Sequence, residues 1–411
     1  MKKIVNKWKN TNLILKILFG IIIGAALGLL VPKATPISYP GLLFVGALQA
    51  VAPILVFVLV MSSISKAGAG IGSKFKNVII LYMASTFIAA IIAVFVHYIF
   101  PLTVTLVTDS TEKSAPQSLG DIFENLLINI VENPVSAMTN GNYLGILFWA
   151  VIIGLGLKFA ANTATIDMIE NLSNAVSKVV GWIIQCAPFG ILGIVFAAVS
   201  ASGLSIFTSY GVLILELVGT MFFIMLVANP LIIFLCTGEN PYPLVFTCLR
   251  ESAIPAFFTR SSAANIPVNM ALCEKLGLDR EFYSVSIPLG ATINMNGAAV
   301  VLAIMSLTLA HTQGISVPLP MAILLALIAT LGACGTSGVS GGSLLLVPMA
   351  CSLLGISSDI SMQMVAVGFI ISVIQDSMET ALNSSADVAF TATAEKMANK
   401  KANQKKSEVV H

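Results

Sequence analysis

The chain has 411 residues, of which 57% are hydrophobic and 10% are charged. A soluble globular protein carries about 25% charged residues, so most of the outer surface must face lipid. The sequence therefore predicts an all-α polytopic membrane protein, and the formal net charge of +2 gives no support to a nucleic-acid partner.

The first half of the chain contains ordinary hydrophobic segments. A membrane-spanning helix needs about 20 apolar residues. The sequence predicts such spans over residues 13–31, 41–63, 77–101, 142–160, 176–203 and 209–237. The basic flank before residue 13 is typical of a signal peptide, but the apolar run is long enough to span and no small-residue cleavage site follows it. We therefore predict a retained first span.

Lysines indicate which side of the membrane each loop occupies. They collect before the first span, between the second and third, after the fourth and in the C-terminal tail, whereas the loop 102–141 is acidic. Basic residues accumulate on the cytoplasmic side. Both termini are therefore predicted to be cytoplasmic.

The second half of the chain has polar interruptions at membrane depth. Segments 243–275 and 318–354 each consist of an apolar arm, a tip rich in Ser or Gly and a second apolar arm, which predicts two re-entrant helical hairpins. Each is followed by a span with a polar centre, at 281–310 and 360–396. This order suggests two inverted repeats with a substrate site near the midplane, because irregular backbone survives there only where it is buried or lines a cavity.

Polar side chains follow one face of the last span. Asp376, Glu379, Thr380, Asn383 and Asp387 have helical spacing. An amphipathic surface helix would show the same pattern. However, a charged group at bilayer depth costs about 2.5–3.5 kcal/mol, so three carboxylates here favour a functional role. An Asp suits a substrate ammonium group, and carboxylate and carbonyl oxygens suit a hard cation such as Na⁺.

Other polar groups lie at the predicted interruptions. An unwound turn at Asn294–Gly297 would free carbonyl groups for a cation, although these Asn side chains could also join helices. Ser261 and Ser262 begin a helix whose N–H groups attract a carboxylate, and the tip 335–342 is rich in Gly. Each tip alone could be a flexible loop, but the matching pair favours a site.

No motif for nucleophilic or metal catalysis and no phosphate-binding loop occurs, so neither an enzyme nor an organic cofactor is predicted.

Four ordered motifs, TRSSAANIP, PLGATINMNG, GTSGVSGG and QDSMETALNSSAD, resemble the signature segments of the dicarboxylate/amino acid:cation symporters, the glutamate transporter superfamily. Among its members the chain looks most like the bacterial serine/threonine:sodium symporters. The resemblance implies eight transmembrane helices plus two re-entrant hairpins, a homotrimer in the bacterial cytoplasmic membrane and an elevator mechanism. It also implies scaffold spans in 1–76 and 142–203, a transport domain formed by 77–101, 209–237, 243–275, 281–310, 318–354 and 360–396, and a basic cytoplasmic tail, 397–411.

The resemblance also assigns site residues. The substrate contacts fall on Arg260, Ser261, Ser262, Val339, Asp376, Glu379, Thr380 and Asn383, with Asp376 holding the amino group and Ser262 and Asn383 the α-carboxylate. The main Na⁺ site falls on Gly290, Asn294, Asn383 and Asp387. A second Na⁺ site falls on carbonyl groups of Thr292, Met295, Ala333 and Thr336.

The chain departs from the acidic-substrate members in three places. Those members carry Arg at the position of Glu379 and Thr at that of Ala298, so this chain should reject glutamate and aspartate and take a small neutral hydroxy amino acid, L-serine or L-threonine. Asn296 replaces the Asp of a third Na⁺ site whose other members are Tyr82, Ser85 and Thr86, and we expect fewer coupled ions. On the sequence alone, hydroxyls placed in mid-span like those of Tyr82, Ser85 and Thr86 more often serve helix packing than ion binding. Proton coupling through Glu379 and an ion channel remain alternatives to sodium symport.

Overall fold

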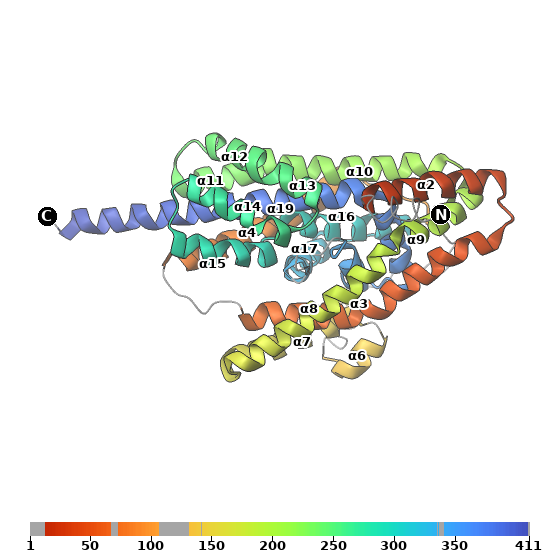
Figure 1. The fold of residues 1–411 in the computed structure, drawn as a ribbon, viewed down its shortest axis with the longest axis horizontal. Helices are drawn as coiled ribbons and strands as arrows, with labels where there is room; N and C mark the ends of the chain where they lie inside the picture. Colours follow the sequence, from red (N-terminus) through yellow and green to blue (C-terminus); the bar gives the residue numbers. More distant parts are fainter. Residues whose placement is uncertain are drawn as a thin grey trace, which may run out of the picture.

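The computed structural model of the protein describes residues 13–66, 73–106, 131–140, 142–334, 336 and 341–409, and within these ranges the regular structure is entirely helical. The helices form two packing groups that lie against each other (Figure 1). The predicted residue Val339 lies outside the described residues.

The first packing group is built on α3 and α9. Its elements are α2 (Leu13–Leu30), η1 (Thr35–Ser38), α3 (Tyr39–Lys66), α6 (Pro134–Asn140), α7 (Tyr143–Ala160), α8 (Thr163–Gln185) and α9 (Ala187–Ser202). Helix α2 packs along α9, and α3 packs against α7, α8 and α9.

Glycines allow α2 and α9 to approach closely. Gly20, Gly24 and Gly28 are spaced four residues apart and so share one face of α2. A Cβ atom on Gly24 would lie 2.5 Å from the carbonyl oxygen of Leu192. This spacing of small residues is the usual device by which membrane helices bring their backbones together.

The fifth predicted span is longer than the sequence indicated. Helix α8 begins at Thr163, whereas the prediction placed the start at residue 176. Asn162 caps α8 because its side chain accepts a hydrogen bond from the backbone N–H of Thr165. Helix α8 then bends by 54° into α9 near Cys186, where Pro188 interrupts the backbone hydrogen bonding.

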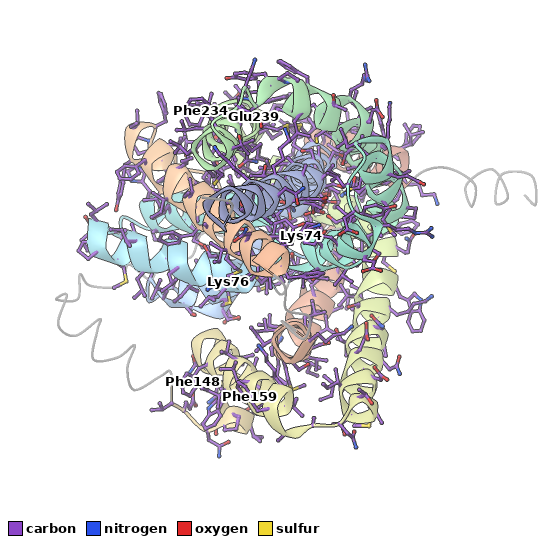
Figure 2. The ribbon with its side chains drawn as sticks, turned by 90° about the vertical axis from the view of Figure 1, so that its left-hand side faces the viewer. Lys74, Lys76, Phe148, Phe159, Phe234 and Glu239 are labelled. Atoms are coloured by element: carbon purple, nitrogen blue, oxygen red, sulfur yellow. The ribbon has the colours of Figure 1, made fainter. Side chains whose placement is uncertain are left out.

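The second packing group surrounds α19 (Ser358–Val409). Its other elements are α4 (Ser73–Ile99), α10 (Ser205–Phe223), η2 (Ile224–Ala228), α11 (Asn229–Thr237), α12 (Tyr242–Cys248), η3 (Leu249–Ala253), α13 (Ile254–Thr259), α14 (Ser262–Lys275), α15 (Arg280–Ile293), α16 (Asn296–Thr312), α17 (Leu319–Ala333), η4 (Leu344–Leu346) and α18 (Val347–Ser352). Figure 2, which looks along the bundle from the C-terminal side, shows α19 in the middle and α7, marked by Phe148 and Phe159, lying apart from it.

Two segments of this group turn back on themselves. Residues 242–275, which we call hairpin 1, form one arm of α12, η3 and α13 and a second arm, α14, that packs against the first. Residues 319–352, which we call hairpin 2, have α17 and α18 as their arms. The wide π-helical turns η2 and η3 each precede a proline, Pro230 and Pro255. Proline removes a backbone donor and crowds the preceding turn, which explains the local widening.

Several helices are suited to crossing a membrane by length and hydropathy. In the described residues these are Thr35–Lys66, Lys74–Ile99, Phe207–Thr237, Arg280–Thr312 and Ser358–Lys400, and the bent pair α8–α9 would be a sixth. Leu15–Leu30, Phe148–Ala160 and Leu319–Ala333 are apolar but shorter. The protein is therefore an all-helical chain with several apolar helices, while the count of eight spans stays a prediction.

Ion pairs occur at the end of the bundle that faces the viewer in Figure 2, where Lys74 and Glu239 are labelled. Lys74 pairs with Asp279 at 2.8 Å, and Lys396 pairs with Glu239 at 2.8 Å. These charged side chains mark an aqueous end of the bundle, whereas the carboxylates of the next section lie inside it.

Candidate functional site

The polar stripe of α19 is enclosed by other helices. Asp376, Glu379, Thr380, Asn383 and Asp387 are all buried, with at most 6% of any of them exposed. The tip of hairpin 1, residues Gly341 and Ser343 of hairpin 2, and the break between α15 and α16 reach this stripe through the contacts below. The pattern on one helix face, which the sequence predicted, therefore faces the protein interior and not a water surface.

The tip of hairpin 1 places a guanidinium group on the stripe. Helix α13 ends at Thr259, and Arg260 adopts the left-handed conformation with φ 52°. It is the one non-glycine residue with positive φ among the residues that the structure describes. Its Nε donates to Oδ2 of Asp376 at 2.7 Å. The left-handed conformation of a non-glycine residue is unfavourable by of order 1 kcal/mol or more. At Arg260 this conformation occurs together with the buried ion pair to Asp376.

The next residue begins the second arm of hairpin 1. Ser261 is the N-cap of α14, and its side chain accepts a hydrogen bond from the N–H of Ala264 at 3.2 Å. Ser262 follows at the first position of α14 and is buried. Helix N-termini carry free N–H groups that attract anions, so this end of α14 is suited to a carboxylate.

Hairpin 2 reaches the same carboxylates. The backbone N–H of Gly341 donates to Oδ1 of Asp376 at 3.3 Å, and the hydroxyl of Ser343 donates to Oε2 of Glu379 at 2.7 Å. Asp376 thus accepts hydrogen bonds from both hairpins. Thr336 is buried and its hydroxyl donates to the carbonyl of Ala333 at 2.9 Å.

The break between α15 and α16 surrounds Asp387. The side-chain amide of Asn294 donates to Oδ1 of Asp387 at 2.8 Å. A Cβ atom on Gly290 would lie 2.7 Å from the same oxygen, so only glycine allows this approach. The N–H of Gly297 donates to Oδ1 of Asn383 at 2.7 Å. Four residues that the resemblance assigned to the main Na⁺ site, Gly290, Asn294, Asn383 and Asp387, therefore lie together.

One oxygen of this group is suited to a cation. Oδ2 of Asp387 is fully buried and accepts no hydrogen bond from the described residues. A buried charge without a partner is costly, and a cation would remove that cost. No cluster of three or more His, Cys, Asp or Glu side chains in the described ranges is arranged to hold a metal. The ligands at Asp387 would therefore be its carboxylate and neighbouring carbonyl and amide oxygens, which suit a hard cation.

The predicted second Na⁺ site is divided between two elements. Thr292 lies at the end of α15 and Met295 in the break, whereas Ala333 ends α17 and Thr336 lies just beyond that helix. The thiol of Cys334 donates to the carbonyl of Ile293 at 3.4 Å, which brings these two ends together. The carbonyl of Ala333 already accepts hydrogen bonds from the N–H and hydroxyl of Thr336.

The predicted third site is a neutral hydrogen-bond network. Oδ1 of Asn296 accepts from the hydroxyls of Thr86 at 2.9 Å and Ser85 at 3.2 Å. Its amide nitrogen faces Oδ1 of Asn229 at 3.5 Å. The hydroxyl of Tyr82 lies 2.9 Å from that of Thr391 and bonds the Asp387 carbonyl at 3.2 Å. The four predicted residues lie in one region, next to Asp387.

Two groups of polar residues near the site were not predicted from the sequence. Gln375 and Ser343 are both donors to Glu379, and Gln375 was recognisable from its i, i+4 spacing to that residue. The second group joins hairpin 1 to α19 through hydrogen bonds among Ser252, Asn265, Asn269 and Ser384. The i, i+4 pair Asn265 and Asn269 on an otherwise apolar arm was the signal for it.

The fold and the site define a multi-pass membrane protein whose buried polar centre is reached by two hairpins and a broken helix. The model of the sodium:dicarboxylate symporter family matches residues 13–397, and the chain belongs to that family. It is 55% identical over 397 residues to the serine/threonine transporter SstT of Streptococcus agalactiae serotype III (strain NEM316), covering 96% of this chain and 98% of the relative.

Two further relatives carry the same name. The serine/threonine transporter SstT of Streptococcus thermophilus (strain CNRZ 1066) is 53% identical over 402 residues, covering 98% of this chain and all of the relative. That of Bifidobacterium adolescentis is 54% identical over 395 residues, covering 96% and 92%. The family resemblance inferred from four motifs is thereby confirmed.

Proposed function

We propose that the chain is a sodium-coupled symporter that imports L-serine and L-threonine across the cytoplasmic membrane. The observation that carries the proposal is the convergence of the hairpin 1 tip, Ser343 of hairpin 2 and a helix break on three buried carboxylates of α19. The relatives named as serine/threonine transporters, at 53–55% identity, support the substrate.

A zwitterionic amino acid matches the charges at Asp376. That carboxylate accepts from Arg260 and from the N–H of Gly341. The substrate ammonium would bind Asp376, and the substrate carboxylate would bind Arg260 and the end of α14 at Ser262, so that one ligand replaces the existing ion pair. Among the described residues, the amide of Asn383 donates to the sulfur of Met295 alone, a weak acceptor, and this donor would turn to the substrate carboxylate.

Glu379 determines which class of side chain the substrate can carry. A buried carboxylate beside Asp376 repels a second carboxylate, which excludes aspartate and glutamate. The same group accepts a hydrogen bond from a hydroxyl, which serine and threonine provide. Thr380 donates its own hydroxyl to the carbonyl of Asp376 at 2.8 Å and lines the same face.

The coupling ion would bind at Asp387. Its unpaired oxygen supports a principal Na⁺ site with Gly290, Asn294 and Asn383. A second ion would use the carbonyl groups near Thr292 and Thr336 once hairpin 2 closes. The neutral network around Asn296 supports fewer coupled ions than a site with a carboxylate there.

Movement would take place between the two packing groups. We assign α2, α3, α7, α8 and α9 to a fixed scaffold in a homotrimer, and the group around α19 to an elevator-type transport domain. The separate packing of the two groups supports this division. The ion-paired end with Lys74 and Lys396 would be cytoplasmic, in keeping with the lysine distribution.

The test is uptake of labelled L-serine into proteoliposomes under an inward sodium gradient. Parallel vesicles carry a proton gradient, and excess unlabelled aspartate is added as a competitor. We expect sodium-driven accumulation that aspartate does not inhibit. The variant Asp387→Asn should raise half-saturation by sodium at least about tenfold, or about 1.4 kcal/mol. Proton-driven accumulation would overturn the ion assignment. Serine movement without accumulation would indicate a channel.

A further inference from the structure

One oxygen of the Glu379 carboxylate carries two protein donors. Oε2 accepts from the side-chain amide of Gln375 at 2.5 Å and from the hydroxyl of Ser343 at 2.7 Å. No hydrogen bond reaches Oε1 from the part of the chain that the structure describes, and Oε1 is not among the fully enclosed polar atoms that lack a partner. Among the described residues, therefore, both donors meet one oxygen of Glu379, and the other oxygen is available to a donor that enters the site.

The base of the Glu379 side chain is fixed from the opposite side. A Cβ atom on Gly297 would lie 2.8 Å from Cα and 3.0 Å from Cγ of Glu379, so α16 lies directly against this residue. Gln375 is one helical turn away on the same helix, and both Gln375 and Ser343 are buried. Because packing fixes the base of the Glu379 side chain, the orientation of its carboxylate depends on these two donors.

Resting on the proposed function, we propose that Ser343 and Gln375 are specificity-determining residues that hold Oε2 of Glu379 so that Oε1 accepts the substrate hydroxyl. Hydrogen bonds to an ionised acceptor are stronger than neutral ones. A site built around a substrate hydroxyl rejects the analogue that lacks it, because its own acceptor is left unpaired. Serine satisfies Oε1, whereas alanine does not.

The two donors come from different elements. Gln375 belongs to α19, but Ser343 belongs to hairpin 2. Recognition of the hydroxyl and the position of hairpin 2 therefore depend on the same carboxylate. A substrate with a hydroxyl completes the set of donors to Glu379 only while hairpin 2 lies against α19.

The experiment compares serine and alanine in proteoliposomes, with half-saturation measured for serine uptake and inhibition of that uptake measured for alanine. In Ser343→Ala we expect half-saturation by serine to rise about tenfold while inhibition by alanine changes less than about twofold. Ser343→Thr retains a hydroxyl and should restore the preference. Ser352→Ala is the matched control on hairpin 2, because its hydroxyl bonds the carbonyl of Met349 within its own helix.

A purely structural role for Ser343 would weaken serine and alanine equally, or would leave Ser343→Thr as unselective as Ser343→Ala, and either result overturns the proposal. If Ser343→Ala does not fold, Gln375→Met removes the other donor and should lower the same serine-to-alanine ratio. Failure of the wild-type chain to accumulate serine on a sodium gradient is a different result and counts against the proposed function itself.

Discussion

Hairpin 1 and hairpin 2 are attached to α19 in different ways. The arms of hairpin 1 are joined to α19 by neutral hydrogen bonds: Asn265 and Asn269 donate to the hydroxyl of Ser384 at 2.7 and 3.0 Å, and Asn269 also donates to the Ser384 carbonyl. Its tip is joined by the ion pair between Arg260 and Asp376. Hairpin 2 reaches the stripe through Gly341 and Ser343, which donate to the carboxylates of Asp376 and Glu379.

The difference indicates which hairpin moves. The contacts of hairpin 1 along its arms involve protein groups alone, so ligand binding leaves them unchanged. Both polar contacts that the described residues of hairpin 2 make with the stripe use carboxylates that the proposed function gives to the substrate. Substrate binding therefore alters the attachment of hairpin 2 and not that of the hairpin 1 arms, which makes hairpin 2 the gate in our interpretation.

The largest effect is expected from breaking the hairpin 1 attachment. Asn269→Leu removes the donor to Ser384 and the acceptor of the Ser252 hydroxyl, whose bond is 2.5 Å long. Leaving these buried groups unpaired should destabilise the fold by on the order of 3 kcal/mol. Thermal unfolding in detergent measures the change.

The control on hairpin 2 is Ser343→Ala, which we expect to melt within about 2 °C of the wild type. Equal losses of stability in the two variants would contradict the distinction between the hairpins.

The sequence was sufficient to place helical arms within 243–275 and 318–354 and to align the polar residues on one face of α19. Interruptions such as Thr259–Ser262 and Asn294–Gly297 are visible because polar residues at membrane depth are rare. It could not reveal that α8 begins at Thr163, because this stretch alternates charged and apolar residues like a surface helix. This stretch nevertheless continues without a break into the predicted span, and its residues Ile169 and Ser173 are buried.

The partners of each site residue were also beyond the sequence. Asp376 was assigned to a substrate ammonium, but its pairing with Arg260 depends on a left-handed residue at the tip. Ser343 was part of an apparently uniform Ser/Gly-rich segment. Which hydroxyl of this segment donates to Glu379 depends on how hairpin 2 packs against α19, and this packing is a tertiary property.

A smaller effect is expected in hydrogen exchange. Sodium and serine together should slow exchange of backbone amides at residues 341–352 by about tenfold, because closure of hairpin 2 adds contacts. Amides of α14 in hairpin 1 should change less than about twofold. Mass spectrometry of peptides from each hairpin, with and without both ligands, provides the comparison. Equal protection of both hairpins would mean that the hairpin 1 arms also take part in gating.

The smallest effect is expected at the aqueous end of the bundle, far from either hairpin tip. The hydrogen bond from Lys74 holds the pKa of Asp279 below its usual value. This ion pair therefore adds stability above about pH 3.9, the ordinary value, and the contribution is lost as the pH falls through the folded-state pKa. Because Asp279 is largely solvent-exposed, salt and water screen the pair.

The variant Asp279→Asn removes the charge but retains an N-cap side chain for α15. We expect its melting temperature to fall by at most about 2 °C at pH 7. The difference from the wild type should shrink as the pH falls below about 3.9 and disappear below the folded-state pKa of Asp279. A drop at pH 7 as large as that of Asn269→Leu would mean that exposed ion pairs, and not the buried hydrogen bonds of hairpin 1, hold this half of the bundle together.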